Sequence, residues 1–543
     1  MFRHRTRWLY VGLGVALRAA LLGWGVYQDT NMPLPYTDVD YTVYNDGARA
    51  LWSACPLAAT VDSPLYHDED DLFNEPALAH VHCAQGILPV VSRFVLKNDP
   101  TLDEPVEQHF YDSESLWSQI ASWCFTLTHP FFRFFASLGD PYARDTYRYT
   151  PLLALVLGPA HASGAGALFG KVLFALADVA CALLMWAILD ERAEMHAHEA
   201  PGLASAYATH LPGLLWLLNP FPAQIATRGS ADSLVGLLVL AFLYLLIRAT
   251  PEVALVQEPR VQKLPQPHDP SELRVANQAC WCGAAFCLAL AVHLKLYPVV
   301  YGASVLAHLA KYRHHVLRLL CGIAKPQRRD VLWLGTEFAA LCAVMYLLMN
   351  VAVWLVWGEP FLRHALLYHV LRQDHRHNFS VYFLPTYLTW DWDAHTSWVH
   401  ALAASPLASF VPQMIAVALV GFGLGGRDLV MACTVQTVVF VAWNKVYTSQ
   451  YFLWYLWFLP IIGTTLSFPR RAEVGALIVL WAGAQAAWLA LAYRLEFMAQ
   501  NTFVYLWLSS LGLLLVHVVC VQRCLRAWQR WRHRQAAAKQ KAE

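Results

Sequence analysis

The chain has 543 residues, of which 57% are hydrophobic, 13% aromatic and only 14% charged. Soluble domains carry about 25% charged residues, so this composition excludes a soluble globular protein and indicates a polytopic membrane protein. The formal net charge is +1, which gives no sign of a nucleic-acid partner, and we expect none. The positions of the charges along the chain are therefore more informative than their sum.

Apolar stretches recur along the chain, and at about 20 residues per helix they predict about twelve transmembrane helices. We expect these spans near residues 8–27, 168–189, 203–222, 231–248, 279–295, 297–310, 331–357, 398–424, 429–446, 451–467, 472–493 and 503–522. The fifth and sixth are short and adjacent, which is typical of a broken helix pair. A short apolar stretch at 150–160 is typical of a re-entrant segment. The predicted fold class is an all-α polytopic membrane protein.

Basic residues gather in four places: the first seven residues, the loops 311–330 and 468–471, and the tail from residue 523. With twelve spans all four lie on one side, which the positive-inside tendency makes cytoplasmic. The segment 249–278, rich in Pro, Gln and Glu, falls on this side and is expected to be a linker. The predicted parts are a cytosolic N-terminus with the first span (1–27), a non-cytoplasmic loop (28–149), a multi-span domain (150–522) and a basic cytosolic tail (523–543).

Two carboxylates, Asp38 and Asp40, follow about ten residues after the first apolar stretch. In an extended segment these two side chains would share one side, with Val39 facing away. Such a pair near a membrane surface can act as a general base, bind a divalent cation or be merely solvated. The pattern alone leaves all three roles open, and a metal, if one binds, would be held by Asp38 and Asp40.

Five cations are predicted at span ends on the non-cytoplasmic face: Arg148, Arg228, Lys295, Arg372 and Arg376. Positive charges on that face run against the usual tendency, and charges at membrane depth usually face a cavity. Arginine offers phosphate oxygens a planar fork and lysine a point charge, so these side chains predict a phosphate clamp. Snorkelling of each side chain to the interface is the alternative.

Four further residues or runs bear on the predicted site, and some of them have more than one interpretation. Asp232 at the start of a span is explained either by helix capping or by a functional site. Asp178, inside the second span, is expected to pair with a cation across the bundle. Asn378 begins a glycosylation sequon close to other polar patches, which argues against its use. The aromatic run 447–457 is an interfacial belt, a lipid-tail groove or a sugar platform.

Together these residues describe a membrane-embedded site with a carboxylate pair and several cations suited to phosphate. A transfer from a lipid phosphate to a hydroxyl would use the carboxylate as base and the cations to stabilise the leaving phosphate. A proton-coupled anion transporter is the alternative, although the two halves of the chain show no inverted repeat.

Eight stretches then carry a resemblance: YTDVDY (36–41), TYRYTPLL (146–153), Gly170-Lys171 with Phe174 and Asp178, LNP (218–220), RGSADS (228–233), HLKLYP (293–298), RHNFS (376–380) and SQYFLWY (449–455). These stretches extend over nearly the whole chain, and in their residues and their order they resemble the GPI mannosyltransferase I family. Enzymes of this family add the first mannose to the glycosylphosphatidylinositol (GPI) anchor precursor.

The resemblance implies a glycosyltransferase C superfamily fold in the endoplasmic reticulum membrane, with a lumenal active site and both termini cytosolic. It implies dolichyl phosphate mannose as donor, glucosaminyl-(acyl)phosphatidylinositol as acceptor, an α1,4 bond and a small single-span stabilising subunit. The family's D-x-D motif maps onto Asp38 and Asp40, one of which would be the base of an inverting displacement. Another lumenal mannosyltransferase with the same donor is the nearest alternative. We expect contacts to the donor phosphate or substrate from Arg148, Arg228, Lys295, Arg376, Tyr147, Asp232, His293 and Gln450.

One segment departs from the family pattern. The family joins the D-x-D loop to the TYRYTP stretch by a short connection, whereas here residues from about 56 to 128 intervene. We expect a lumenal extension, and an unspliced or mispredicted segment is the alternative. Cys55, Cys83 and Cys124 would lie in the lumen, where a disulfide between two of them leaves the third unpaired.

Overall fold

The computed structural model describes residues 2–53, 55, 83–97, 128–159, 168–195, 203–251, 277–319, 322–372, 378–389 and 405–542. In these ranges every regular element is helical, and one isolated bridge pairs Cys83 with Gly139, so the predicted all-α class is confirmed there. The chain forms two compact units. Unit 1 comprises residues 1–36, 172–346 and 370–543, and unit 2 comprises residues 37–171 and 347–369.

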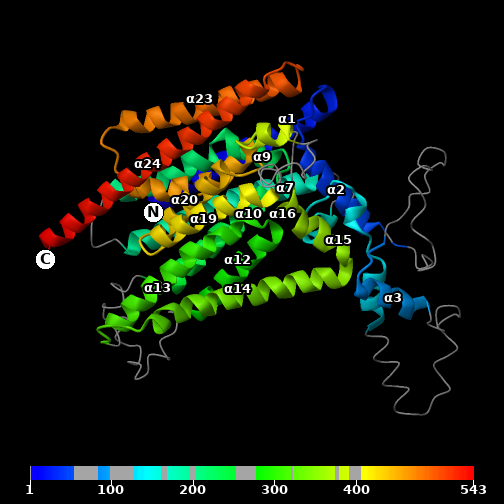
Figure 1. The fold of residues 1–543 in the computed structure, drawn as a ribbon, viewed down its shortest axis with the longest axis horizontal. Helices are drawn as coiled ribbons and strands as arrows, with labels where there is room; N and C mark the ends of the chain where they lie inside the picture. The colour runs from blue at the N-terminus through cyan, green and yellow to red at the C-terminus, as the bar shows by residue number, and fades with distance from the viewer. Residues whose placement is uncertain are drawn as a thin grey trace, which may run out of the picture. The chain divides into compact units, whose positions relative to one another are not determined.

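Seven helices of the described ranges are long and apolar enough to cross a membrane. They are α1 (Phe2–Asn31), α7 (Leu168–Met195), α10 (Asp232–Ala249), α14 (Arg328–Trp357), α19 (Pro406–Gly425), α23 (Arg471–Glu496) and α24 (Phe503–Ala542) (Figure 1). Two shorter apolar helices, α12 (Gln278–Leu294) and α20 (Leu429–Ala442), coincide with two more predicted spans. Several spans predicted from composition are therefore present as helices, with boundaries shifted by a few residues.

The other three predicted spans are broken rather than continuous. They form α8 (Leu203–Pro212), the π-helical turn η2 (Gly213–Leu217) and α9 (Pro220–Thr227); η3 (Tyr297–Tyr301) and α13 (Gly302–Leu319); and η5 (Ser449–Phe452), α21 (Leu453–Leu456), α22 (Leu459–Ile462) and η6 (Gly463–Thr465). Pro212 and Pro460 lie at breaks within their spans, and proline lacks the N–H that a continuous helix needs. Pro298 lies in the first turn of η3, just after the break between α12 and η3, so the predicted broken helix pair is confirmed. Irregular backbone at membrane depth is tolerated where protein buries it, and Phe452 and Trp457 are indeed fully buried.

Unit 1 is a bundle whose helices pack in neighbouring pairs. Helix α10 packs on α12, α19 on both α13 and α20, and α23 runs beside α24 (Figure 1). Its core contains the fully buried rings of Trp216, Trp281 and Trp457. The short helices α16 (Tyr368–Leu371), whose last residues belong to this unit, and α17 (Phe383–Leu388) complete it.

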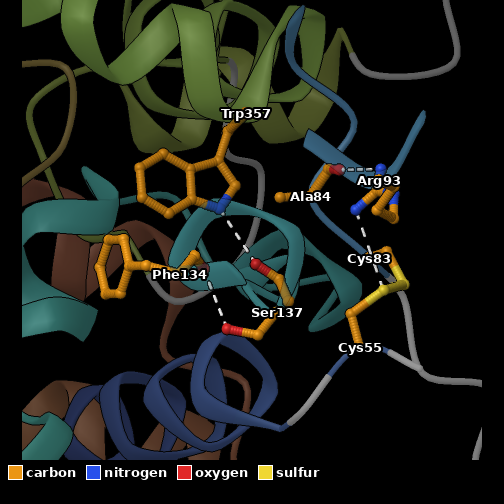
Figure 2. Close-up of a disulfide and its surroundings, with 8 residues drawn as sticks. Cys55, Cys83, Ala84, Arg93, Phe134, Ser137 and Trp357 are labelled. Atoms are coloured by element: carbon orange, nitrogen blue, oxygen red, sulfur yellow. Dashed lines mark hydrogen bonds between the residues drawn. A yellow bond between two sulfur atoms is a disulfide. The ribbon is translucent and has the colours of Figure 1, made fainter. Parts of the chain in front are cut away.

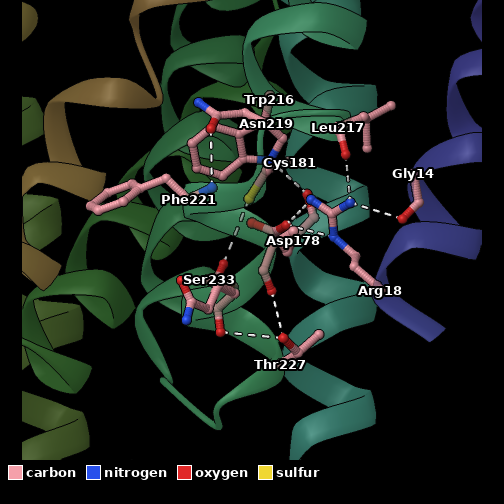
Figure 3. Close-up of polar contacts among 12 residues, drawn as sticks. Gly14, Arg18, Asp178, Cys181, Trp216, Leu217, Asn219, Phe221, Thr227 and Ser233 are labelled. Atoms are coloured by element: carbon pink, nitrogen blue, oxygen red, sulfur yellow. Dashed lines mark hydrogen bonds and ion pairs between the residues drawn. The ribbon is translucent and has the colours of Figure 1, made fainter. Parts of the chain in front are cut away.

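A buried ion pair ties three elements of unit 1 together (Figure 3). Arg18 of α1 donates through Nε to Asp178 Oδ2 of α7 at 2.8 Å, and through Nη2 to the same oxygen. Its Nη1 donates to the carbonyl oxygens of Gly14 and Leu217, each at 2.9 Å. The two charged side chains are 2% and 0% exposed, so the predicted pairing of Asp178 with a cation across the bundle is confirmed.

Unit 2 is built from short helices. They include α2 (Val39–Trp52), α3 (Ile87–Lys97), η1 (Pro141–Ala143), α5 (Pro151–Val156), α15 (Glu359–Phe361) and the π-helical turn η4 (Leu362–Leu367). The first residues of α7 and the last residues of α14 also belong to this unit. Asp38, Asp140 and Thr150 each precede one of these helices and accept a hydrogen bond from a backbone N–H of its first turn. Such caps explain why helices begin at these positions. The apolar stretch at 150–160 contributes the six-residue α5.

A disulfide joins Cys55 to Cys83 in unit 2 across a sequence separation of 28 residues (Figure 2). Next to it, Arg93 Nη2 donates to the carbonyl oxygen of Ala84 at 2.7 Å. The sequence left open whether two of the loop's three cysteines pair, and the structure pairs Cys55 with Cys83. Cys124, with most of the predicted extension, lies outside the described residues, as does most of the predicted linker 249–278.

The basic tail is part of a helix rather than a separate segment. Helix α24 continues without a break past the predicted boundary at residue 522 to Ala542. Arg530 Nε and Arg534 Nη1 donate to the carbonyl oxygen and hydroxyl of Ser467 at 3.0 and 2.7 Å. These contacts hold the C-terminal part of α24 against the short loop between η6 and α23.

Candidate active site

Asp38 and Asp40 lie at the start of α2. Asp38 has extended backbone angles (φ −70°, ψ 143°), and its Oδ1 accepts a hydrogen bond from the Asp40 N–H at 3.1 Å. Val39 already begins the helix, so the expectation of an extended segment with both carboxylates on one side is wrong. The physical reason is that an N-cap carboxylate satisfies a first-turn N–H and starts a helix. Asp38 is the cap, and Asp40 lies in the first turn, where the helix dipole favours a negative charge.

Lys171 of α7 lies against the same turn. Its Nζ donates to Thr37 Oγ1 at 2.5 Å, and its backbone N–H donates to the Tyr41 hydroxyl at 3.2 Å. Lys171 is 5% exposed and Tyr41 is fully buried. Our sequence-based set of site residues did not include Lys171, although the Gly170-Lys171 stretch within the resemblance was a signal that pointed to it.

Arg148 is half-buried in unit 2 and held on two sides. Its Nη1 donates to His364 Nδ1 at 2.5 Å, and its guanidinium carbon lies 4.7 Å from the centre of the Tyr368 ring. Because arginine is always the donor in this contact, His364 accepts as a neutral imidazole. Burial and then the Arg148 cation lower the pKa of His364, which favours this neutral form. The predicted phosphate ligand is therefore positioned by neighbouring side chains and is not snorkelling freely.

Tyr147 is a packing residue in this structure. Its side chain is fully buried, and its hydroxyl donates to the carbonyl oxygen of Thr150 at 2.9 Å. A Cβ atom at Gly47 of α2 would come within 2.5 Å of the Tyr147 ring, so the ring packs directly on that helix. The buried ring supports α2, and a contact between Tyr147 and substrate stays a prediction.

In unit 1, Asp232 and Lys295 form the centre of a polar cluster. Lys295 Nζ donates to Asp232 Oδ1 at 2.5 Å, and Trp454 Nε1 donates to the same oxygen at 3.1 Å. Ser230 Oγ donates to Asp232 Oδ2 at 3.1 Å. The Asp232 side chain is 1% exposed and that of Lys295 is 26% exposed. The N-cap of α10 is Ala231, without a side-chain bond, so the ion pair, and not capping, explains Asp232.

Aromatic rings cover the Lys295 ammonium. Its Nζ lies 4.7 Å from the ring centre of Trp454 and 5.4 Å from that of Tyr451, both within cation–π range. Tyr297 stacks on Trp454 with ring centres 4.0 Å apart and planes 4° from parallel. Trp454 is 2% exposed, so the aromatic run contributes to a buried site here and is not simply an interfacial belt.

Arg228 anchors the backbone that leads towards the D-x-D segment. Its Nε donates to the carbonyl oxygen of Tyr36 at 2.9 Å, and the Tyr36 hydroxyl hydrogen-bonds Thr227 Oγ1 at 2.8 Å. These contacts lie within unit 1. Nε of Arg228, a predicted phosphate ligand, thus holds the backbone at Tyr36.

The remaining predicted residues have different surroundings. Gln450 Nε2 donates to Ser230 Oγ at 2.6 Å, which joins Gln450 to the cluster around Asp232. His293 is buried in the last turn of α12, two residues before Lys295. Arg376 lies outside the described residues. The structure thus brings Gln450, Asp232 and Lys295 together in one cluster of unit 1.

The sequon asparagine is engaged in the fold. Asn378 is 3% exposed, its Nδ2 donates to the carbonyl oxygen of Lys445, and its Oδ1 accepts from the Tyr447 N–H at 2.8 Å. A glycan on Nδ2 would displace the first of these bonds and require the side chain to leave its buried position. We therefore expect Asn378 to carry no glycan in the folded protein.

Within the described ranges, no three His, Cys, Asp or Glu side chains gather as a ready metal site. Asp38 and Asp40 offer carboxylate oxygens of the kind that Mg²⁺ takes from proteins, with water and substrate phosphate completing its shell. A metal at this pair would compete with the N–H of Asp40 for Asp38 Oδ1.

Comparison with known proteins gives the family. A family model described as mannosyltransferase (PIG-M) matches residues 225–525, more than half of the chain. A Danio rerio protein, GPI alpha-1,4-mannosyltransferase I, catalytic subunit, is 33% identical over 523 residues, which cover 95% of this chain and 96% of that protein. GPI mannosyltransferase 1 of Aspergillus oryzae is 31% identical over 94% of both chains. GPI mannosyltransferase 1 of Gibberella zeae is 34% identical over 71% of this chain and 82% of its own.

The matches cover the D-x-D segment, the cluster around Lys295 and nearly all of the helices, so they concern the whole chain and not one motif. They also set aside the anion transporter that composition and charge had left open. The chain belongs to the PIG-M family of mannosyltransferases and is a membrane-embedded glycosyltransferase of GPI-anchor biosynthesis.

Proposed function

We propose that the chain transfers the first mannose of the GPI anchor, in α1,4 linkage, to glucosaminyl-(acyl)phosphatidylinositol, with dolichyl phosphate mannose as donor. The observation that carries this proposal is the nearly full-length match to the Danio rerio protein, whose name states an α-1,4-mannosyltransferase and a catalytic subunit. The same name supports a second subunit here, which we propose to be a small single-span protein that stabilises this chain.

The reaction is a single displacement with inversion at the mannose C1. A bond forms between that carbon and O4 of the acceptor glucosamine, and the bond to the phosphate oxygen breaks. We assign Asp40 as the base that takes the hydroxyl proton, while dolichyl phosphate leaves with the bonding electrons. Asp38 Oδ1 is occupied as the cap of α2, which favours Asp38 as the residue that fixes the turn.

Lys295 is suited to the donor phosphate. Asp232 and two aromatic rings hold its ammonium in place, while 26% of the side chain stays exposed. A fixed cation stabilises the charge that develops on a leaving phosphate without having to reorganise during the reaction. Arg148, held by His364, is proposed as a second contact to substrate phosphate.

The disulfide supports a lumenal position for the D-x-D segment. Disulfides persist in oxidising compartments such as the lumen of the endoplasmic reticulum and are rare in the cytosol. Cys55 follows α2 by three residues and pairs with Cys83 in the same unit. We therefore propose that α2 and its two carboxylates face the lumen of the endoplasmic reticulum.

Complementation of cells that lack the first GPI mannosylation step tests the function. The wild-type chain, expressed with its partner subunit, is expected to restore GPI-anchored proteins at the cell surface. Microsomes of these cells should transfer labelled mannose from dolichyl phosphate mannose to the glucosaminyl acceptor. Continued accumulation of the unmannosylated intermediate would reject the proposal, and label on a different lipid would favour another acceptor.

A further inference from the structure

Lys171 contacts both ends of the segment that carries the two aspartates. Its ammonium holds Thr37, the residue before Asp38, at 2.5 Å, and its backbone N–H holds the hydroxyl of Tyr41, the residue after Asp40, at 3.2 Å. The same ammonium lies 5.7 Å from the centre of the Tyr41 ring. All of these residues belong to unit 2. The turn that presents Asp38 and Asp40 is thus bracketed by one lysine.

The position of Lys171 is poor for the stability of its own helix. Lys171 lies in the first turn of α7, where the helix dipole disfavours a cation. It is also 5% exposed, and a buried ammonium loses hydration that its partners must offset. Residues that break such local rules concentrate at functional sites.

Gly170 makes the contact with Tyr41 sterically feasible. A Cβ atom at this position would come within 2.6 Å of the Tyr41 hydroxyl and of Leu157 Cδ2. Glycine therefore lets the Tyr41 ring reach the backbone of α7, where its hydroxyl accepts the Lys171 N–H. Packing and hydrogen bonding act together to fix the end of the turn.

We propose that Lys171 is a positioning residue for the mannosyl transfer, and that it sets the direction in which the first turn of α2 presents Asp40 to the acceptor hydroxyl. The inference rests on the proposed function, because it assigns a task within that reaction. Thr37 is its partner in this task. Neither side chain is proposed to exchange a proton with the substrate.

Lys171→Met and Thr37→Val test the contact from its two sides. Methionine keeps most of the length of the buried stem but loses the ammonium, and valine keeps the shape of threonine but loses the hydroxyl. In microsomes with equal amounts of folded enzyme, each is expected to lower kcat by roughly 10²-fold, the effect of a misplacement of about 1 Å. The acceptor KM should change by less than about threefold, because binding groups are left intact.

Three comparisons separate positioning from a structural role. Thr37→Ser, which keeps the hydroxyl, should recover most of the kcat lost in Thr37→Val. The double variant of Lys171→Met with Thr37→Val should have a kcat no lower than that of Lys171→Met alone, because both substitutions remove the same bond between Lys171 Nζ and Thr37 Oγ1. Thr42→Val is the matched control, since the Thr42 hydroxyl donates within α2 itself, to the carbonyl oxygen of Val39 at 2.7 Å.

Retention of wild-type kcat by folded Lys171→Met and Thr37→Val would overturn the inference, as would additive losses in the double variant. If a variant is less stable but each folded molecule transfers mannose at the wild-type rate, the inference is also overturned. If the wild-type chain itself transfers no mannose, the proposed function fails. An active wild type with unaffected variants leaves the function standing and rejects only the role of Lys171.

Discussion

At the scale of single residues, the D-x-D pair divides into two different carboxylates. Asp38 precedes the helix and accepts from the Asp40 N–H, while Asp40 is itself helical. Two residues of one type, separated by a single position, thus meet different backbone environments. The difference allows capping and catalysis to be tested separately.

Asp40→Asn is expected to lower kcat by roughly 10²- to 10⁴-fold, because the base is lost while the shape of the side chain is kept. Asp38→Asn should keep α2 capped, whereas Asp38→Ala should lose about 1 kcal/mol of stability, since asparagine caps a helix and alanine does not. Mannosyl transfer in microsomes and thermal unfolding of the purified protein measure the two effects. Equal kcat for Asp40→Asn and the wild type would contradict the assignment of the base.

Asp140 is a second carboxylate whose environment decides its charge. Burial raises the pKa of Asp140 to about 6, against a smaller opposing effect of its bond to the Tyr142 N–H. The folded protein therefore binds this proton more tightly than the unfolded chain does. Protonation stabilises the fold below about pH 4, and this contribution is lost as the pH rises through about 6.

Asp140→Asn is accordingly expected to be more stable than the wild type at pH 8, by at most about 3 kcal/mol. Asparagine keeps the oxygen that caps η1, so the comparison isolates the charge. The advantage should disappear as the pH falls below about 4. Thermal unfolding of both proteins across this pH range measures it, and a difference that does not vary with pH would contradict the prediction.

At the scale of helices, two ion pairs join α1 to α7 in different surroundings. Arg18 and Asp178 are buried, whereas Arg7 donates to an Asp190 whose side chain is 49% exposed. A buried pair that loses one partner leaves an uncompensated charge, but an exposed carboxylate returns to water. The two pairs form a matched set within the same two helices.

Arg18→Met is therefore expected to lower the stability of the protein by about 3–5 kcal/mol, through the unpaired Asp178 carboxylate. Arg7→Met, the control at the pair whose carboxylate is half-exposed, should lower stability by less, about 1 kcal/mol. Thermal unfolding in detergent and the amount of protein in the membrane measure both. Equal effects of the two variants would show that burial does not set the strength of this contact.

The disulfide acts on the chain entropy of unit 2. It closes a separation of 28 residues, for which the loss of unfolded-chain entropy corresponds to about 3.6 kcal/mol. Cys55→Ala, Cys83→Ala and the double variant should be destabilised by similar amounts, because each removes one bond. Cys520→Ala, at a free half-buried cysteine, is the control. A double variant that is clearly worse than both single variants would contradict this account.

At the scale of the whole molecule, the proposed topology has a direct test. A glycosylation sequon introduced between residues 60 and 75 should gain a glycan, because this stretch follows the D-x-D segment into the proposed lumenal extension. A sequon appended after Glu543 should stay unmodified. Native Asn378 should also stay unmodified, because it is buried and bonded. Endoglycosidase-sensitive shifts on gels report each case, and a modified tail would reverse the orientation.

Much of the helical framework could be predicted because its cause is local. Apolar stretches of about 20 residues and basic flanks are properties of single segments, and α1, α10 and α23 lie where these patterns placed them. The break between α12 and η3 was predicted, because the two apolar stretches are short and adjacent, whereas the breaks at η2 and η5–η6 were not. Proline marks a weak point in a helix, but whether the freed backbone groups find partners depends on neighbouring helices.

The sequence predicted several residues of the candidate site but not how their side chains are arranged. Asp232, Lys295 and Gln450 were all named from the sequence, and the structure joins them in one cluster. Tyr147 was also named, and the structure adds that its ring is fully buried in unit 2. Lys171 was not named among the site residues, because its role depends on contacts with residues about 130 positions away.

The sequence by itself determined the class of the protein: a membrane-embedded, all-helical enzyme whose ordered motifs resemble one mannosyltransferase family. These properties depend on composition and on short patterns, which fold does not alter. Only the tertiary structure decided that Asp38 is a cap, that Asp178 pairs with Arg18, and that Lys171 brackets the turn that carries Asp38 and Asp40. Each of these is a contact between a side chain and its surroundings, and such contacts are set by how the helices pack rather than by their order in the chain.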